Sequence, residues 1–437
     1  MTRALTAAIV LVLVATHAFA QQRMFALVPH TVERATYVWE VRIDNGVATD
    51  RRLRALVDGS GSGPAVAGGG QFLLWSAIFS LSLPRPIVAW DRASGSTFGI
   101  STWPSLGGAA YVSDPSRARV FLGVGEIRTV SASGTTILPG TTGFSPSAVA
   151  AEGTRLYAAR VVGSGPSVMV ELLTLNPESG AMLAEPLPVG GYPQGIVPSR
   201  DHASIWTITS APGGFDTQTL VRFDLSSGDE LFATPLPTAG PTVHNYRLVG
   251  VDERRGSAFL LERRGSASGS ILHTYDSATG TPIAAVPFDG PADAGLDAGA
   301  GQVLVLSQFA EHGTLHTISA TTGQLTSSAP LGHIGPYNPL FQVAFAAPPL
   351  PPSLDAPVVS STRSVTLSWT PSPEQTTHVT VEAGSAPGLA NLAIMTVPTG
   401  QTLTVPDVPP GTYYVRVKAA NHIGDSVPSN EIVVAVP

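Results

Sequence analysis

A short phrase recurs along this chain, in which an apolar strand ends near Asp or Asn and then turns through a Ser/Thr-Gly pair. Five full copies occupy residues 89–95, 174–180, 222–228, 274–280 and 317–323, a shorter relative occupies 129–134, and 42–46 is a degenerate first copy. The closing glycines at 46, 95, 134, 180, 228, 280 and 323 are 39 to 52 residues apart. A period of this length indicates one supersecondary unit that is repeated to build a common core.

Each phrase predicts a tight antiparallel hairpin. The Asp or Asn side chain can accept hydrogen bonds from backbone amides two or three residues on, and the glycine can adopt the positive φ that lets the next strand run back. A second signal precedes the phrase, in which a strand lined with small residues, such as 248–252, turns into a longer apolar strand, such as 258–261. Four strands per repeat at this period predict the blades of a β-propeller, with seven as the first choice and six or eight as alternatives.

A propeller ring closes best when a strand from one end of the chain completes a blade begun at the other, because this pairing removes two exposed strand edges. Residues 341–345 follow the last hairpin and alternate like a strand, while 25–28 and 37–41 are apolar strands near the start. We therefore expect these three segments to share one blade.

The repeats stop at a proline-rich stretch, 346–352, which predicts a stiff, extended linker. Beyond it, 365–369 places Trp369 on a strand, and 411–419 alternates so that Tyr413, Val415, Val417 and Ala419 share one face. The preceding Val-Pro-Pro-Gly segment, 408–411, is the kind of corner at which a tyrosine hydroxyl returns to the backbone.

On these residues, the repeats resemble the surface-layer-type and quinoprotein-type β-propellers, and the C-terminal segment resembles a fibronectin type III domain, an immunoglobulin-like sandwich. Taken together, the sequence patterns and the resemblance predict a signal peptide at 1–20, a propeller at 21–347, a proline-rich linker at 348–356 and a fibronectin type III domain at 357–437. The last domain would act as a spacer or adhesive module, although the chain contains no Arg-Gly-Asp triplet.

Composition indicates an exported protein. Residues 1–20 combine Arg3, an apolar run and an Ala-Phe-Ala ending before Gln21, which is the pattern of a cleaved secretory signal, so a secreted or periplasmic location is expected. The chain has no cysteine, which excludes a disulfide framework and a cysteine metal cluster. Its net charge of −7 and sparse basic residues argue against a nucleic-acid partner. We expect a monomer with no membrane span in the mature chain.

Catalytic patterns are thin, and we expect no cofactor, no metal and no catalytic residue. His312 and His316 are four apart but belong to an alternating strand pattern, so they would not share a helical face. The aspartates at 289, 293 and 297 could supply oxygen ligands to calcium, yet they lack the spacing of a recognised calcium loop, and a polar loop between blades is the preferred interpretation. The quinoprotein repeats carry a tryptophan four residues after the glycine, and no copy here does.

The sequence therefore predicts a non-catalytic binding or adhesion protein whose propeller is the recognition platform for a protein or glycan. Loops before the inner strands carry one aromatic residue each, which can stack on a sugar or anchor a protein partner, although packing between blades is the alternative. These ligand-binding candidates are Trp103, Tyr192, Tyr246 and Tyr337. The alternative function is a carbohydrate-active or lyase-type propeller enzyme, which would need Asp201, His202, Asp252 and Glu262 to converge.

Overall fold

A computed structural model describes most of the chain beyond the N-terminal segment. The described residues are 22–30, 35–44, 47–58, 60–67, 70–78, 85–103, 110–114, 117, 119–123, 126–131, 133–141, 146–152, 154–163, 169–189, 191–199, 201–210, 217–237, 245–264, 269–335, 342–372 and 376–437. Across these ranges the regular structure is entirely β, in agreement with the predicted all-β class. No helix long and apolar enough to cross a membrane is found among them.

Six four-stranded antiparallel sheets are simple meanders of consecutive strands. Their strands are β4 (Ser60–Ala67), β5 (Phe72–Ile78), β6 (Arg85–Asp91), β7 (Thr97–Trp103); β8 (Ala110–Ser113), β9 (Arg119–Gly123), β10 (Ile127–Ser131), β11 (Gly134–Ile137); β12 (Pro146–Glu152), β13 (Arg155–Val162), β14 (Met169–Leu175), β15 (Leu187–Val189); β16 (Tyr192–Pro198), β17 (Ser204–Ser210), β18 (Gln218–Asp224), β19 (Glu230–Pro235); β20 (Asn245–Asp252), β21 (Ser257–Arg263), β22 (Ser270–Asp276), β23 (Pro282–Phe288); β24 (Ala292–Asp297), β25 (Gln302–Phe309), β26 (His312–Ser319) and β27 (Leu325–His333).

A seventh sheet joins the two ends of the repeat region. Its order is β28 (Gln342–Ala346), β1 (Gln22–His30), β2 (Ala35–Asp44) and β3 (Val47–Asp58). The closing strand β28 pairs antiparallel with β1, with Ala344 opposite Phe25. This pairing confirms the predicted shared sheet, although Phe341 lies outside the described residues.

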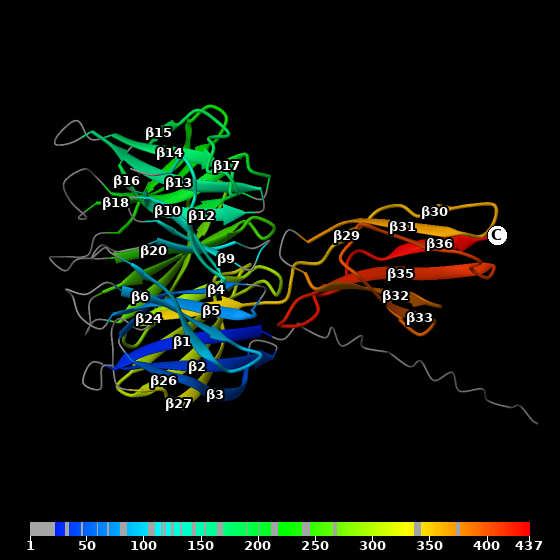
Figure 1. Cartoon of the computed structure of the whole chain (residues 1–437), viewed down its shortest axis with the longest axis horizontal. Coiled ribbons are helices and arrows are strands. Elements are labelled where there is room, and N and C mark those ends of the chain that lie inside the picture. The colour runs from blue at the N-terminus through cyan, green and yellow to red at the C-terminus, as the bar shows by residue number, and fades with distance from the viewer. Residues whose placement is uncertain are drawn as a thin grey trace, which may run out of the picture.

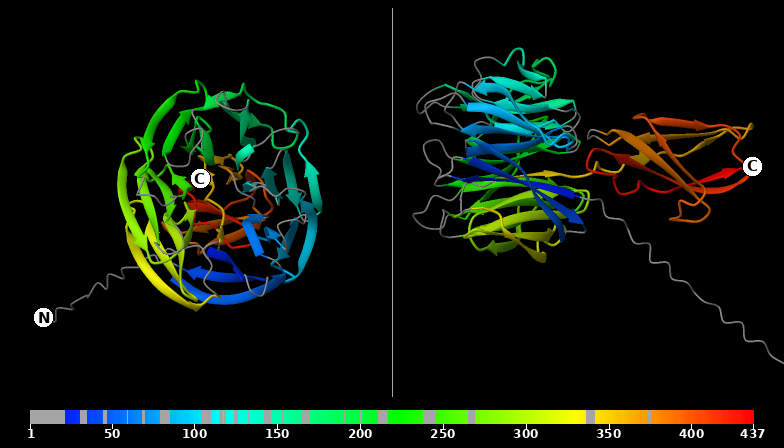
Figure 2. Two further views of the ribbon diagram at one scale, coloured as in Figure 1. Left: turned by 90° about the vertical axis from the view of Figure 1, so that its left-hand side faces the viewer. Right: turned by 60° about the horizontal axis from the view of Figure 1, so that its bottom comes forward.

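The first strands of successive sheets contact one another around a ring. The sequence of contacts runs β28, β4, β8, β12, β16, β20, β24 and back to β28, so each sheet presents its innermost strand to the axis. Figure 2 shows this ring face-on, with the sheets radiating from its centre. Large side chains fill the space between sheets, where Trp75, Trp90 and Trp206 are fully buried.

The recurrent phrase forms the hairpin that its residues predict. In the copy that ends β22, the Asp276 carboxylate accepts hydrogen bonds from the amides of Ala278 (3.0 Å) and Thr279 (2.8 Å). Asn176 and Asp224 accept the equivalent pairs in their own copies. The glycine that follows has a positive φ in all five full copies, between 67° and 79°. The predicted turn is therefore confirmed in its side-chain bonds and its backbone angle.

The same glycines also set the spacing between neighbouring sheets. The backbone at Gly280 lies so close to the preceding sheet that an added Cβ would stand 2.5 Å from the ring of Phe232, and Thr234 Oγ1 donates to the Gly280 carbonyl (2.9 Å). Gly323 meets Thr274 in the same way. The hairpin is thus a contact between sheets as well as a turn within one.

Beyond the ring, the chain forms a two-sheet sandwich. One sheet contains β29 (Ser353–Leu354), β31 (Val365–Thr370), β30 (Val358–Val359) and β34 (Thr402–Val405), and the other contains β33 (Ala393–Val397), β32 (His378–Gly384), β35 (Gly411–Ala420) and β36 (Ile432–Val436).

Trp369 is buried in the core of this sandwich, and the Tyr413 hydroxyl donates to the Pro409 carbonyl (2.8 Å), as the corner motif predicts. Because Leu354 pairs with Trp369, the sandwich already includes residues that the sequence assigned to the linker 348–356.

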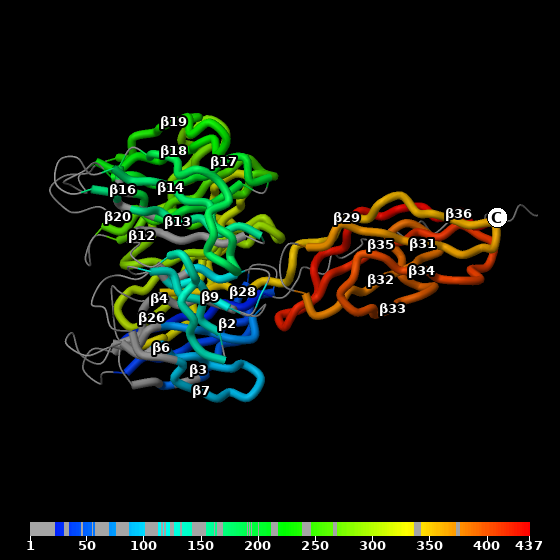
Figure 3. The backbone as a smooth tube through the Cα atoms, turned by 45° about the horizontal axis from the view of Figure 1, so that its top comes forward, coloured from blue at the N-terminus to red at the C-terminus, as the bar shows by residue number. Residues whose placement is uncertain are grey.

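The sandwich docks on one side of the ring, which we call the hairpin face because it carries the glycine hairpins (Figures 1 and 3). The loop between β35 and β36 inserts Ile423, which is only 6% exposed, into a core shared by the two sheets that contain β1 and β5. Asn421 Nδ2 donates to the Ala347 carbonyl (2.9 Å). The loop after β35 therefore anchors the second domain on the ring, in addition to the proline-rich connection.

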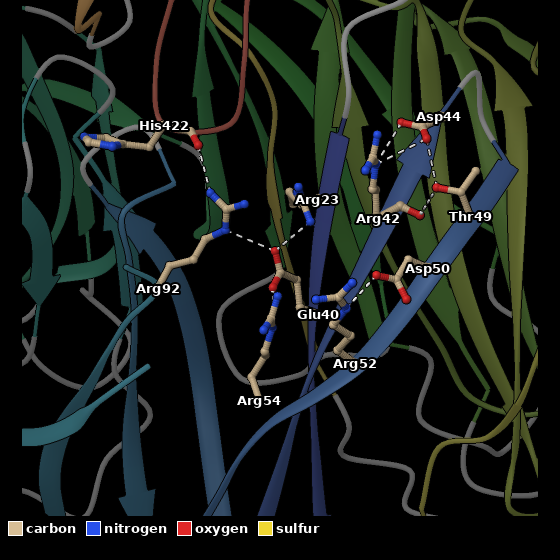
Figure 4. Close-up of polar contacts among 10 residues, drawn as sticks. All are labelled: Arg23, Glu40, Arg42, Asp44, Thr49, Asp50, Arg52, Arg54, Arg92 and His422. Carbon is tan, nitrogen blue, oxygen red and sulfur yellow. Dashed lines mark hydrogen bonds and ion pairs between the residues drawn. The ribbon is translucent and has the colours of Figure 1, made fainter. Parts of the chain in front are cut away.

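A cluster of charged residues around the buried Glu40 also connects the ring to the sandwich (Figure 4). Glu40 is 2% exposed and pairs with Arg23 (3.0 Å), Arg54 (2.6 Å) and Arg92 (3.1 Å). Arg92 also donates to the carbonyl oxygen of His422 in the sandwich (2.8 Å). The three cations exceed the charge of one carboxylate, and a main-chain carbonyl of the second domain takes up one of their surplus donors.

The hairpin glycines provide a matched pair of substitutions. Gly95 and Gly280 have nearly the same φ, 70° and 69°, but an added Cβ meets nothing within 4 Å at Gly95. Gly95→Ala should cost about 1–2 kcal/mol of unfolding free energy for the left-handed backbone alone. Gly280→Ala should cost roughly 1–3 kcal/mol more, because Phe232 and Thr234 must move. Urea unfolding measures both, and equal costs would contradict the role of the glycine in sheet spacing.

Because the loop after β35 packs into the ring, we expect the two domains to move as one rigid body. Ile423→Asp places a charge in an apolar core and should release the sandwich from the ring, which small-angle X-ray scattering would record as a longer maximum dimension. Val433→Asp is the matched control, because Val433 is exposed on the same sandwich. Unchanged scattering of the Ile423→Asp protein would show that the loop does not hold the domains together.

Candidate functional site

The side of the ring opposite the sandwich, which we call the open face, follows from the meander. The turn between the first and second strands of a sheet and the turn between the third and fourth lie on the hairpin face. The other connections therefore lie on the open face, where β20 and β24 begin and β21 and β25 end. The view in the left panel of Figure 2 looks onto this face, and the sandwich is seen behind the ring.

A charged cluster lies near the open-face ends of β20, β21 and β24. Asp293, the second residue of β24, is buried, and its Oδ1 accepts from Arg247 on β20 and from Arg263 on β21 (2.9 Å). Its Oδ2 accepts the Val343 amide of the closing strand β28 (2.7 Å). One carboxylate therefore joins three successive sheets of the ring.

The Arg247 side chain is only partly buried. Its side chain is 41% exposed. Partial burial lowers the pKa of Arg247, and the negative charge of Asp293 opposes this effect. The exposed fraction shows that part of this guanidinium group remains accessible to solvent. Its Nη2 also donates to the Ala294 carbonyl (2.6 Å), which fixes the guanidinium in place.

A second network lies within the sheet of β20 to β23. Glu262 is buried and pairs with Arg264 Nε (2.6 Å) and His273 Nε2 (2.6 Å). Burial raises the pKa of the neighbouring Tyr246, and the Glu262 charge adds to that rise. This arrangement stabilises the carboxylate inside the sheet.

The predicted ligand residue Tyr246 belongs to this buried region. Its side chain is 2% exposed, packs in the core between the β16–β19 and β20–β23 sheets, and donates from its hydroxyl to the Pro237 carbonyl (2.7 Å). The expectation of an exposed ring is wrong at this position, because the start of β20 turns the ring inward, and the packing alternative describes it.

The other three candidates are not placed in detail. Trp103 ends β7 and Tyr192 begins β16, both at the open-face ends of their strands, but their side chains are not among the described ones. Tyr337 lies outside the described residues. Their ligand role stays a prediction.

Exposed apolar side chains on the open face come from positions that the sequence analysis did not select. Phe309 is 70% exposed at the end of β25, beside a tight turn in which Ala310 has a φ of 52°. Met169 is exposed at the start of β14. The sequence alone does not distinguish these exposed residues from buried apolar residues, because their exposure depends on where the turns lie in the folded ring.

The carboxylates and histidines suggested for an enzyme do not converge. Asp201, His202 and Asp252 lie at turns on the hairpin face, whereas Glu262 lies near the open-face end of β21 and pairs with that end of β20. Six residues of extended strand separate Asp252 from Tyr246, the partner of Glu262, which is about 20 Å. No group of three or more His, Asp or Glu side chains suited to a metal is found among the described residues.

Two of the three aspartates considered for calcium occupy a strand, whereas Asp289 lies in the turn between β23 and β24. Asp293 and Asp297 both lie on β24, four residues apart, so their side chains are about 13 Å apart along the strand. Asp293 is bound to arginines, and burial raises the pKa of Asp297 against the opposing bonds from the Ala300 and Gly299 amides. The loop interpretation of these two residues is wrong.

The site residues Arg247, Arg263 and Asp293 were missed as a group. One signal was available: Arg247 interrupts an inner strand whose other residues from 246 to 251 are apolar or glycine. The partners come from 16 and 46 residues further along, and only the packing of the two neighbouring sheets shows that they meet.

No protein-family model matches the sequence, and no curated protein matches it. Among solved structures, the chain is similar to a periplasmic gluconolactonase from Pseudomonas aeruginosa, with a TM-score of 0.54 and 13% identity over 75% of this chain and 99% of that one. It is also similar to a putative 6-phosphogluconolactonase from Bacteroides fragilis, with a TM-score of 0.50 and 13% identity over 74% and 98% of the two chains. At such identities the likeness shows the fold alone, and that fold is a β-propeller.

Proposed function

We propose that this protein is an exported, non-catalytic binding or adhesion protein that recognises its ligand on the open face of a seven-bladed propeller. Each of the seven four-stranded sheets would be one blade, and the sheet containing β28 would be the closing blade. The sandwich, with its buried Trp369 and tyrosine corner, would be a fibronectin type III domain.

A single observation carries the choice of face. The chain's own second domain occupies the hairpin face through Ile423, Asn421 and Arg92, while the open face keeps exposed Phe309 and the accessible Arg247. Exposed aromatic residues and arginines are the kinds of side chain that anchor ligands on binding surfaces. Export is supported by the signal pattern of residues 1–20 and by the periplasmic location in the name of the Pseudomonas protein.

An enzyme is the second candidate. Two structural neighbours are named as a gluconolactonase and a putative 6-phosphogluconolactonase, so hydrolysis of a sugar lactone is the concrete form of the carbohydrate-active alternative. Turnover of a lactone by the purified protein would favour this function. Stable binding to a glycan or protein without turnover would favour the first.

The binding function predicts specific hits when residues 21–437 are probed against arrays of glycans and extracellular proteins. Phe309→Ala should weaken the strongest hit about fivefold or more, because an anchoring aromatic is worth over 1 kcal/mol. Leu183→Ala is the matched control, since Leu183 is also exposed and apolar but follows a hairpin on the other face.

If Leu183→Ala disrupts ligand binding and Phe309→Ala does not, the site lies on the hairpin face and the proposed open-face site is contradicted. In the same assay, alanine substitutions at Trp103, Tyr192 and Tyr337 test whether the loop aromatics predicted from the sequence contribute to ligand binding. Arrays without any hit, together with lactone turnover, would contradict the non-catalytic function.

A further inference from the structure

We propose that the open-face end of the propeller axis binds an oxyanion, meaning a carboxylate, phosphate or sulfate group of a small ligand, on the guanidinium groups of Arg247 and Arg263. The inference rests on the proposed function, because it assigns a ligand chemistry to the same face. It follows from the charge, the free donors and the access at this one cluster.

The cluster carries one more positive charge than its partners neutralise. Asp293 is its carboxylate, and two guanidinium groups share a single oxygen of it. The other oxygen is taken by the Val343 amide. The single negative charge of Asp293 balances only one of the two guanidinium groups, so one positive charge remains in this cluster.

The cationic donors are only partly used. A guanidinium has five N–H donors. Arg247 makes its described bonds through Nη2 alone, to Asp293 and to the Ala294 carbonyl, and its enclosed Nε has no partner among the described residues. Arg263 donates through Nε to the Ala292 carbonyl (3.2 Å) and pairs with Asp293 through Nη2. Each arginine thus keeps an unpaired Nη1 within the described part of the chain.

The donors are accessible and already ordered. The side chains of Arg247 and Arg263 are 41% and 24% exposed. Main-chain carbonyls of β24 hold both guanidinium groups in place, so an incoming anion need not pay to order them. Arginine recognises carboxylate and phosphate through a planar fork, and such charge-assisted bonds are strong where hydration is poor.

The ring contains a second cluster of this type, around Glu40. There the surplus donors of three arginines also face a single carboxylate, and the sandwich supplies the His422 carbonyl as an acceptor for Arg92 (Figure 4). At Asp293 no described residue supplies the equivalent acceptor for Nη1. In the Glu40 cluster, an arginine donor is paired with a carbonyl of the sandwich. In the Asp293 cluster, we infer that a ligand oxygen takes the corresponding position.

The test is calorimetric titration of the full mature chain at low ionic strength with phosphate, sulfate and D-glucuronate, and with D-glucose as the neutral match of glucuronate. At least one anion should bind with one-to-one stoichiometry, more weakly as salt is added, while glucose should not bind. The three anions distinguish which oxyanion the site prefers.

Arg247→Gln should weaken the preferred anion about ten- to a hundredfold, the effect of losing a bond to a charged group. Arg247→Lys keeps the positive charge but loses the planar fork of donors, so its affinity for the anion should lie between those of the wild-type and Arg247→Gln proteins. Arg52→Gln is the matched control, because Arg52 also pairs with one aspartate, Asp50, but is exposed on the outer strand β3. If Arg247→Gln lowers the melting temperature strongly, Arg263→Gln serves as the second variant.

Saturable binding that survives both Arg247→Gln and Arg263→Gln would overturn the site, and the absence of saturable binding by all three anions would overturn the ligand class. In the latter case, array hits on neutral ligands would leave the proposed function standing. Anion binding without any array hit would support the site while removing the adhesion function.

Discussion

The architecture depends on the antiparallel pairing of β28 with β1. Five residues from the end of the repeat region complete a sheet begun by the first strands of the chain, and this pairing removes the open edges that a linear array of sheets would leave. The same short strand carries the Val343 amide that Asp293 binds, and its Ala344 and Ala346 pack against Ile423 of the sandwich. Ring closure, the axial charge cluster and the docking of the second domain therefore share one element.

Much of this fold could be predicted from local chemistry. The hairpin phrase specifies its turn through bonds between neighbouring residues, so the roles of Asp276 and Gly280 follow from the amino-acid sequence alone. The alternation around Trp369 and the corner at Tyr413 likewise depend on residues close in sequence. The contact between Gly280 and Phe232 could not be predicted, because it depends on how closely two sheets approach.

The candidate site depends on long-range geometry, and the sequence prediction there was correspondingly weaker. Aromatic residues in loops were chosen for their chemistry, yet Tyr246 packs in the core while the side chain of its neighbour Arg247 is partly exposed. A side-chain period of two makes adjacent residues point to opposite sides, so one position decides between core and ligand surface. The anchoring role of Ile423 was similarly hidden, because a single apolar residue in a loop gives no signal of what it touches.

Hydrogen exchange of the intact mature chain, followed amide by amide, tests the central role of the closing strand most directly. If β28 closes the ring, the hydrogen-bonded amides of β28 and β1 should exchange only through global unfolding of the propeller, as slowly as those of the fully buried strand β17. Early exchange of Val343 to Phe345, while the other sheets stay protected, would show that the ring is stable without its closing strand and would contradict the account.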